Sequence, residues 1–219
     1  MSKINIAIDG PSGAGKSTIS DILASKLGYI HLDTGAMYRT VAYKVLQAGL
    51  KIDDEKNIVN LIETLTFKQT EDGKIICNGE DISKEIRQNE ISMAASDVSK
   101  LLGVRKALVA LQQKTAEEKG YIVDGRDICE VVLPKAEVKL YMIASAEERA
   151  KRRVLQNEEK GIEADYESIL EDIKKRDYQD SHREHSPLRK ADDAIEIDSS
   201  CLTIDETVEK IMEIVKTKI

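Results

Sequence analysis

The stretch Gly10-Pro11-Ser12-Gly13-Ala14-Gly15-Lys16-Ser17 matches the pattern G-x-x-x-x-G-K-[ST] and decides the fold. The short apolar run Lys3–Asp9 precedes it and predicts a strand, and apolar residues at helical spacing from Ile19 to Leu27 follow it. Glycines between a strand and a helix let backbone N–H groups converge on phosphate oxygens, where the helix N-terminus adds partial positive charge. We therefore predict a nucleotide-phosphate loop (P-loop), with Lys16 reaching the β- and γ-phosphates and the Ser17 hydroxyl ligating Mg²⁺.

Composition narrows the class of protein further. The 219 residues include 33 basic and 40 acidic side chains, a net charge of −7, which argues against binding to a nucleic acid polymer. The three cysteines, Cys77, Cys129 and Cys201, are widely spaced and predict reduced thiols in a cytoplasmic protein. No apolar run approaches the roughly 18 residues of a membrane span, and the early strand predicts that no signal peptide is present. We expect a protein that works away from membranes.

Short strands alternate with helices along most of the chain. Four further strand segments are Tyr29–Asp33, Tyr121–Asp124, Lys139–Ile143 and Ala194–Asp198. Helical apolar faces lie between them, for example at Val104, Leu108 and Leu111. This alternation predicts an α/β, three-layer P-loop fold with a five-stranded parallel sheet flanked by helices.

One stretch breaks the alternation. Leu65–Thr70 and Lys74–Asn78 flank the turn Glu71-Asp72-Gly73, and Asn78-Gly79 offers a second turn. This pattern predicts an antiparallel hairpin. We interpret residues 60–95 as a small inserted subdomain within a single core of residues 1–219.

Two strand ends carry polar residues. Thr34, Tyr38 and Arg39 follow the second strand, where side chains of a parallel sheet face the ligand crevice. In the segment 124–127, Asp124 can hold Mg²⁺ through water and Arg126 can bind phosphate with two hydrogen bonds. The alternatives are a solvated Arg39, a packed Tyr38 and an ordinary Asp-Gly turn.

Two groups of arginines occupy helix faces farther along the chain. Arg149, Arg152 and Arg153 share one face, and Arg176 and Arg183 lie with Asp180 on another. Phosphoryl transfer needs several cations around the moving group, which favours a functional role. The alternative is a solvated stripe paired with glutamates. The HREH segment has weak metal-site spacing, so we expect exposed or capping roles for His182 and His185.

Taken together, the motifs resemble the bacterial-type cytidylate kinases among the nucleoside monophosphate kinases. The resemblance covers nearly the whole chain and rests on seven segments, 10–18, 32–39, 97–105, 124–128, 131–136, 148–153 and 176–183. It implies transfer of the γ-phosphoryl group of ATP to CMP or dCMP, with Mg²⁺, in pyrimidine nucleotide metabolism. It also implies an acceptor-binding role for residues 60–95 and a short lid at residues 150–164.

The resemblance also implies roles for individual residues. Catalytic roles fall to Lys16, Arg39, Arg126, Arg152, Arg153 and Arg176. ATP would be held by Gly10, Pro11, Ser12, Gly13, Ala14, Gly15, Lys16, Ser17, Thr18 and Arg149, the last packing on the adenine. CMP would be held by Thr34, Tyr38, Arg39, Ser96, Arg105, Arg126, Asp127, Asp180 and Arg183. The metal would be held by Ser17 and, through water, Asp124.

The chain departs from the family pattern at one place, and three different functions compete with this interpretation. The family usually has Gly-Thr where this chain has Cys129-Glu130, which adds a thiol and a carboxylate near the expected acceptor site. A GTPase-like switch would need an N-K-x-D base-reading motif, which the chain lacks. A kinase of a different small acceptor, such as shikimate or gluconate, is the second competing function, and a non-catalytic nucleotide sensor is the third. Nothing in the sequence suggests assembly, so we expect a monomer.

Overall fold

The computed structural model describes residues 3–70, 73–159 and 161–219. The chain forms two compact units. Unit 1 comprises residues 1–31 and 119–219, and unit 2 comprises residues 32–118. Each unit has its own cluster of buried apolar side chains.

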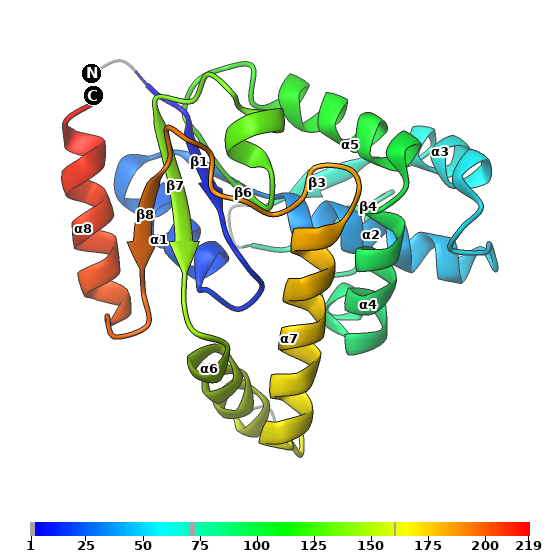
Figure 1. Cartoon of the computed structure of the whole chain (residues 1–219). Helices are drawn as coiled ribbons and strands as arrows, with labels where there is room; N and C mark the ends of the chain where they lie inside the picture. Colours follow the sequence, from blue (N-terminus) through cyan, green and yellow to red (C-terminus); the bar gives the residue numbers. More distant parts are fainter. Residues whose placement is uncertain (1–2, 71–72, 160) are drawn as a thin grey trace. The chain divides into compact units, whose positions relative to one another are not determined.

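The central sheet has five strands in the order β2-β6-β1-β7-β8. The strands are β1 (Ile6–Asp9), β2 (Ile30–Asp33), β6 (Tyr121–Gly125), β7 (Val138–Ile143) and β8 (Ile195–Asp198). β1 pairs in parallel with β6 on one side and β7 on the other, and β7 pairs in parallel with β8. Figure 1 shows β8, β7, β1 and β6 side by side. β1 is the middle strand of the sheet, and all four of its residues are buried, as expected for a strand covered on both faces.

Helices of unit 1 flank this sheet. They are α1 (Lys16–Leu27), α6 (Ala146–Glu158), α7 (Tyr166–His182) and α8 (Ile204–Lys216), together with a π-helix, η2 (Ile128–Val132). α1 and α8 pack together and place Leu23 and Ile211 in the same core as the sheet residues. α6 and α7 lie side by side (Figure 1). The predicted lid, 150–164, spans the C-terminal part of α6 and the segment between α6 and α7; its residue 160 lies outside the described residues.

Sequence accounts for the ends of two of these helices. α1 follows Gly15, which has a φ of 88°, and is closed by Gly28, which has a φ of 66°; both values favour glycine. α8 begins with a capping box in which Thr203 and Glu206 bond each other's backbone N–H groups.

Unit 2 contains the small antiparallel sheet. Its helices are α2 (Thr34–Gln47), α3 (Glu55–Glu63), α4 (Asn89–Val98), α5 (Leu102–Thr115) and a short 3₁₀ turn, η1 (Glu85–Arg87). Its strands are β3 (Phe67–Gln69), β4 (Ile75–Cys77) and β5 (Glu80–Asp81) in the order β3-β4-β5. Both pairs are antiparallel. Of the predicted turn, Glu71 and Asp72 lie outside the described residues.

The predicted parallel and antiparallel sheets are confirmed, with modest changes in strand bounds. β1 begins three residues later than the apolar run at Lys3 suggested, and each hairpin strand is shorter than its predicted segment. β5 extends the predicted hairpin to three strands. The predicted insert, 60–95, lies inside the larger unit 2, and its acceptor-binding role stays a prediction.

Candidate functional site

The glycine-rich loop lies between β1 and α1, as the motif requires. Gly10 has a φ of 150°, and a Cβ atom there would lie 2.1 Å from the Met142 carbonyl oxygen, so only glycine fits. The loop ends at the N-terminus of α1, whose first backbone N–H groups carry partial positive charge. This arrangement suits an anionic phosphate chain.

Lys16 is buried inside the loop. Its Nζ donates to the carbonyl oxygens of Gly10 and Pro11, each at 2.8 Å. Burial, together with the positive charge of Arg126, lowers the pKa of Lys16 to about 7, against the opposing influence of Asp124 and Asp9. Phosphate charge brought to this ammonium would favour its protonated form.

Ser17 and Asp124 meet at the start of α1 and the end of β6. The Ser17 hydroxyl donates to Asp124 Oδ2 at 3.1 Å. Both residues offer oxygen atoms, which are the ligands that Mg²⁺ prefers, and Mg²⁺ usually keeps several waters and binds substrate phosphates as well. The two residues therefore fit the predicted metal role. The described residues contain no cluster of three or more His, Cys, Asp or Glu side chains that could hold a metal ion.

A cluster of arginines surrounds Asp180 in unit 1. Arg126 Nε donates to Asp180 Oδ2 at 2.8 Å. Burial alone would raise the pKa of Asp180, but the charge and hydrogen bond of Arg126, with the charges of Arg176 and Arg183, bring it below its usual value. Arg183 also lies 3.9 Å from Asp127 and donates to the Ser186 carbonyl. Five predicted site residues are thus brought together: Arg126, Asp127, Arg176, Asp180 and Arg183.

Arg149 lies under the P-loop and is almost completely buried. Its two terminal nitrogens bind the Asp177 carboxylate at 2.9 and 2.5 Å, and Nη1 also donates to the Ser12 carbonyl at 3.0 Å. The side chain therefore connects α7 to the P-loop. Its predicted packing on adenine stays a prediction.

The two remaining arginines of α6 differ in their surroundings. Arg152 Nη2 donates to the Ser199 carbonyl at 2.6 Å, which holds it near the C-terminal end of β8. Arg153 is exposed. Their predicted role in lid closure remains untested.

Unit 2 carries the remaining predicted site residues, Thr34, Tyr38, Arg39, Ser96 and Arg105. Asp33 caps α2 by accepting from the Ala36 N–H at 2.8 Å and also accepts from Arg39 Nη2 at 2.9 Å. The Arg105 guanidinium lies 5.9 Å from the centre of the Tyr38 ring. Ser96 is buried on α4, and its hydroxyl has no hydrogen-bond partner among the described residues. A buried hydroxyl in this state has capacity for a polar ligand.

Three residues discussed in the sequence analysis, Cys129, Glu130 and His182, make packing or surface contacts in the structure. The Cys129 thiol is buried against the carbonyl oxygens of Ala7 and Leu140, and burial raises its pKa strongly, so it is a packed residue. Glu130 pairs with the exposed Arg189 at 2.9 Å. His182 is exposed, as predicted, and stacks on Tyr178 with 4.0 Å between ring centres.

Sequence reasoning missed four residues that hold the site. His31, Asp33 and Asp177 contact the predicted residues Asp124, Arg39 and Arg149. Asp9 accepts from the backbone N–H groups of Ile128 and Cys129, next to the predicted residue Asp127. Asp9, Asp33 and Asp177 lie next to the predicted site residues Gly10, Thr34 and Arg176, so adjacency is a signal that could have found them. His31 bonds Asp124, 93 positions away in the sequence, and no local pattern marks it.

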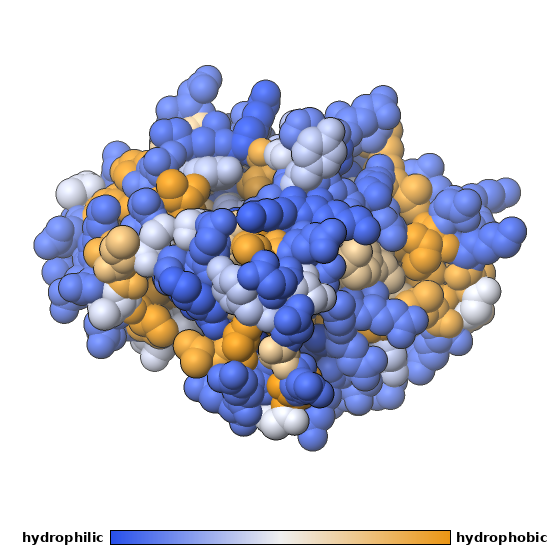
Figure 2. Space-filling model, turned by 60° about the horizontal axis from the view of Figure 1, so that its bottom comes forward, coloured by the Kyte–Doolittle hydropathy of each residue, from blue (hydrophilic) through white to orange (hydrophobic). Residues whose placement is uncertain are grey.

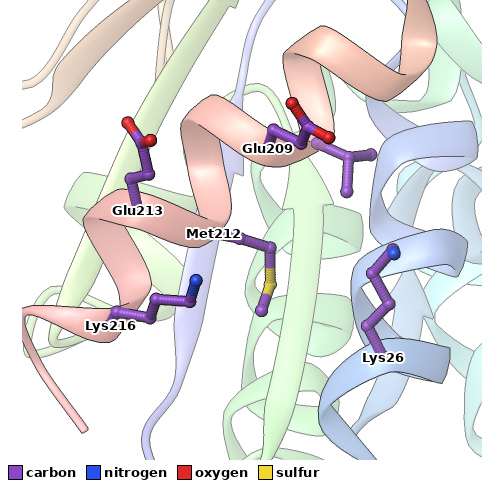
Figure 3. Close-up of a pocket in the computed structure, with 6 residues that line it drawn as sticks. Lys26, Glu209, Met212, Glu213 and Lys216 are labelled. Carbon is purple, nitrogen blue, oxygen red and sulfur yellow. The ribbon is translucent and has the colours of Figure 1, made fainter.

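A groove elsewhere on unit 1 is not the nucleotide site. It lies between α1 and α8 and is lined by Lys26, Val208, Glu209, Met212, Glu213 and Lys216 (Figure 3). Lys26 is ten residues beyond Lys16, about 15 Å along the helix from the P-loop. The groove is lined by both lysines and glutamates, whereas a phosphate site would be lined mainly by positive charge.

Comparison with known proteins decides the family. Residues 6–217 match the cytidylate kinase family. The chain belongs to the cytidylate kinase family. It is 54% identical to a cytidylate kinase of Caldicellulosiruptor bescii, over 98% of this chain and 96% of that protein. It is 49% identical to one of Enterococcus faecalis (100% and 98% covered) and 48% identical to one of Bacillus subtilis (99% and 98%).

Solved structures show likeness in fold alone. An uncharacterized protein from Eubacterium ventriosum has a TM-score of 0.54 at 13% identity, covering 98% of this chain and 99% of its own. A shikimate kinase from Bacteroides thetaiotaomicron has a TM-score of 0.50 at 10% identity, with the same coverage. Among the described residues, no helix is both long and apolar enough to cross a membrane.

Proposed function

We propose that this protein is an ATP-dependent cytidylate kinase that converts ATP and CMP or dCMP into ADP and CDP or dCDP, in pyrimidine nucleotide metabolism. The observation that carries the proposal is the Arg126–Asp180 cluster in a chain that belongs to the cytidylate kinase family. Three arginines around one buried carboxylate would collect positive charge where an acceptor phosphate needs it.

The donor nucleotide would bind the P-loop, residues 10–18. Backbone N–H groups and Lys16 would hold the phosphates, and Ser17 would ligate Mg²⁺ with Asp124 acting through water. When bound, Mg²⁺ would neutralise charge on the phosphates and align them. Arg152 and Arg153 would add positive charge as the lid closes, and Arg176 would bind phosphate as a further cation. Arg149 would pack on the adenine and, through the Ser12 carbonyl, support the P-loop.

The acceptor nucleotide would use residues that occur in both units. In unit 1, Arg126 would bind its phosphate, Asp127 and Arg183 would read the base, and Asp180 would contact the sugar. In unit 2, Thr34, Tyr38, Arg39, Ser96 and Arg105 would contribute, with the buried Ser96 hydroxyl available for the base. The acceptor phosphate is largely ionised at neutral pH, since its second pKa is about 6, so the reaction needs no strong general base.

Three features support a monomer in the cytoplasm. The three cysteines are free, as expected in a reducing compartment. The net charge of −7 disfavours self-association. The face shown in Figure 2 is mostly hydrophilic, with apolar side chains visible in several places.

An acceptor panel tests the proposed reaction. ADP formation would be measured with CMP, dCMP, UMP, AMP and shikimate, with ATP and Mg²⁺ present. We expect turnover with CMP and dCMP and much less with AMP or shikimate. Rapid turnover with AMP but not with CMP would contradict the proposal, and binding of ATP without turnover of any acceptor would indicate a nucleotide sensor.

Substitution of Arg126 tests the site. Arg126→Ala should lower turnover at least about 100-fold, the scale seen when one charge-stabilising donor is lost, while ATP binding stays near wild type. Because Asp180 would lose the hydrogen bond from Arg126, Arg126→Lys is included to keep a positive charge there. Arg189→Ala is the matched control, since Arg189 is exposed and pairs with Glu130. Unchanged turnover in Arg126→Ala would remove Arg126 from the site.

A further inference from the structure

His31 lies between two carboxylates in unit 1. Its Nδ1 is 2.7 Å from Asp21 Oδ1, and its Nε2 is 2.6 Å from Asp124 Oδ1. The imidazole and the Asp124 carboxylate are each only 5% exposed, whereas the Asp21 side chain is 62% exposed. The ring therefore connects a surface carboxylate to a buried one.

The buried carboxylate is shared with Ser17. Asp124 uses Oδ1 for His31 and Oδ2 for the Ser17 hydroxyl, so its two oxygens are engaged from two directions. The terminal torsion of an aspartate is intrinsically broad, so a carboxylate held by one hydrogen bond can turn about it. A second hydrogen bond on the opposite oxygen fixes the plane.

The local geometry brings the three contacts together. Ser17 and Asp21 are four residues apart in α1 and so lie on the same face of that helix. His31 comes from β2 and Asp124 from the neighbouring strand β6. A carboxylate only accepts, so an N–H on Nε2 can donate to Asp124 and an N–H on Nδ1 can donate to Asp21, and the two contacts together fix the orientation of the ring.

We propose that Asp21 and His31 are positioning residues that orient the Asp124 carboxylate for the Mg²⁺-bound end of the donor nucleotide. This inference rests on the proposed ATP-binding function of the P-loop. Partners of this kind around metal sites typically change metal affinity by about 10- to 100-fold when removed. Neither residue belongs to the P-loop motif or to the arginine cluster.

A purely structural role for His31 makes a different prediction. In that case, substitution would lower stability but would leave the effect of Mg²⁺ on ATP binding unchanged. The informative quantity is therefore the gain in ATP affinity on adding Mg²⁺, measured by calorimetry against a sample containing EDTA, with thermal unfolding recorded in parallel.

Two substitutions of His31 distinguish the contribution of Nε2 from that of Nδ1. In His31→Gln the amide nitrogen can replace Nε2 and keep the contact with Asp124, whereas in His31→Asn it can replace only Nδ1. We expect His31→Asn to lower the Mg²⁺-dependent gain at least about tenfold and His31→Gln to retain most of it. Asp21→Asn should lower the gain by a smaller factor, about threefold, because Asp21 is exposed and acts through the ring. His182→Asn, at an exposed histidine on α7, is the control and should match wild type.

The outcomes distinguish this inference from the proposed function. If wild type does not bind ATP, the proposed ATP site is wrong; if it binds ATP without a Mg²⁺-dependent gain, the proposed metal role of Ser17 and Asp124 is wrong, and in either case the inference falls with it. If wild type shows the gain and His31→Asn keeps it, only the positioning role is overturned. Should His31→Asn fail to fold, Asp21→Asn decides, and an unchanged gain in that variant overturns the inference.

Discussion

Asp9 is a buried carboxyl at the end of β1 that supports the backbone of a neighbouring segment. Its two oxygens accept from the N–H groups of Ile128 and Cys129 at 2.7 and 2.8 Å. Burial nevertheless raises its pKa from 3.8 to about 6, because the two hydrogen bonds only partly offset the loss of water. The ionised form is therefore less favourable in the folded protein than in the unfolded chain.

The sign of the resulting pH dependence follows from linkage. Between about pH 4 and pH 6, the folded state holds the proton on Asp9 while the unfolded chain has released it. Its contribution to stability therefore falls as pH rises through this window, by about 3 kcal/mol in all, and is flat above it. Asp9→Asn should remove this pH dependence. The unfolding free energy of wild type minus that of the variant should therefore fall by about 3 kcal/mol as pH rises from 4 to 6.

Urea unfolding at several pH values from 4 to 7 measures this difference. Asp198→Asn is the control, because Asp198 is exposed and its pKa is lowered by its hydrogen bonds to Ser200. Because this control keeps Asp9, the difference in unfolding free energy between wild type and Asp198→Asn should stay constant over the same window. A wild-type-minus-Asp9→Asn difference that stays constant from pH 4 to 7 would contradict the assignment to Asp9.

Residues with a local motif were predictable, and those held by distant contacts were not. The pattern around Lys16 and Ser17 specifies its own backbone, and the structure has the predicted loop between strand and helix. His31 contacts Asp124, 93 positions away, and such a pairing leaves no trace in sequence spacing. The roles given to the individual site residues stay predictions until they are substituted.

Among the helices and strands, too, those marked by a local sequence pattern were predictable and one that depends on distant contacts was not. All five strands of the parallel sheet were predictable, because short apolar runs between helical segments are distinctive. The π-helix η2 was not, since its sequence, ICEVV, is rich in β-branched residues that favour strands. Asp9, at the end of strand β1, accepts from the first two N–H groups of η2 and so stabilises a conformation that local propensity opposes.

One ion pair, between Arg149 and Asp177, connects α7 to the P-loop. Asp177 on α7 binds the Arg149 guanidinium, which donates in turn to the Ser12 carbonyl. Asp177→Asn should destabilise the protein by about 2 kcal/mol, because it weakens a charged hydrogen bond to a buried group. It should also raise the KM for ATP several-fold with a smaller effect on kcat, since the P-loop loses support.

Steady-state kinetics and thermal unfolding check this expectation together. Asp172→Asn is the matched control, at an exposed aspartate on the same helix. A variant at Asp177 that is less stable but has an unchanged KM for ATP would show that the ion pair stabilises α7 without supporting the P-loop.

At the scale of the molecule, the two units divide the predicted ligands unequally. Unit 1 contains every residue assigned to ATP, from Gly10 to Arg149, whereas the residues assigned to CMP occur in both units. Each unit has its own apolar cluster and can thus respond to a ligand through its own stability. Sequence periodicity alone could not show this division, because unit 1 is assembled from two separate parts of the chain.

Hydrogen exchange with each nucleotide separately tests the division. A ligand at 100 times its Kd stabilises the state that binds it by about 2.7 kcal/mol, which slows exchange through opening of that state about 100-fold. ATP with Mg²⁺ should protect amides in residues 10–18 most strongly. CMP alone should protect segments 34–39 and 96–105 of unit 2 as well as segment 124–128 of unit 1. Protection by CMP confined to unit 1 would show that Thr34, Ser96 and Arg105 do not bind the acceptor, and the assignment of those residues would then be wrong while that of Arg126 stands.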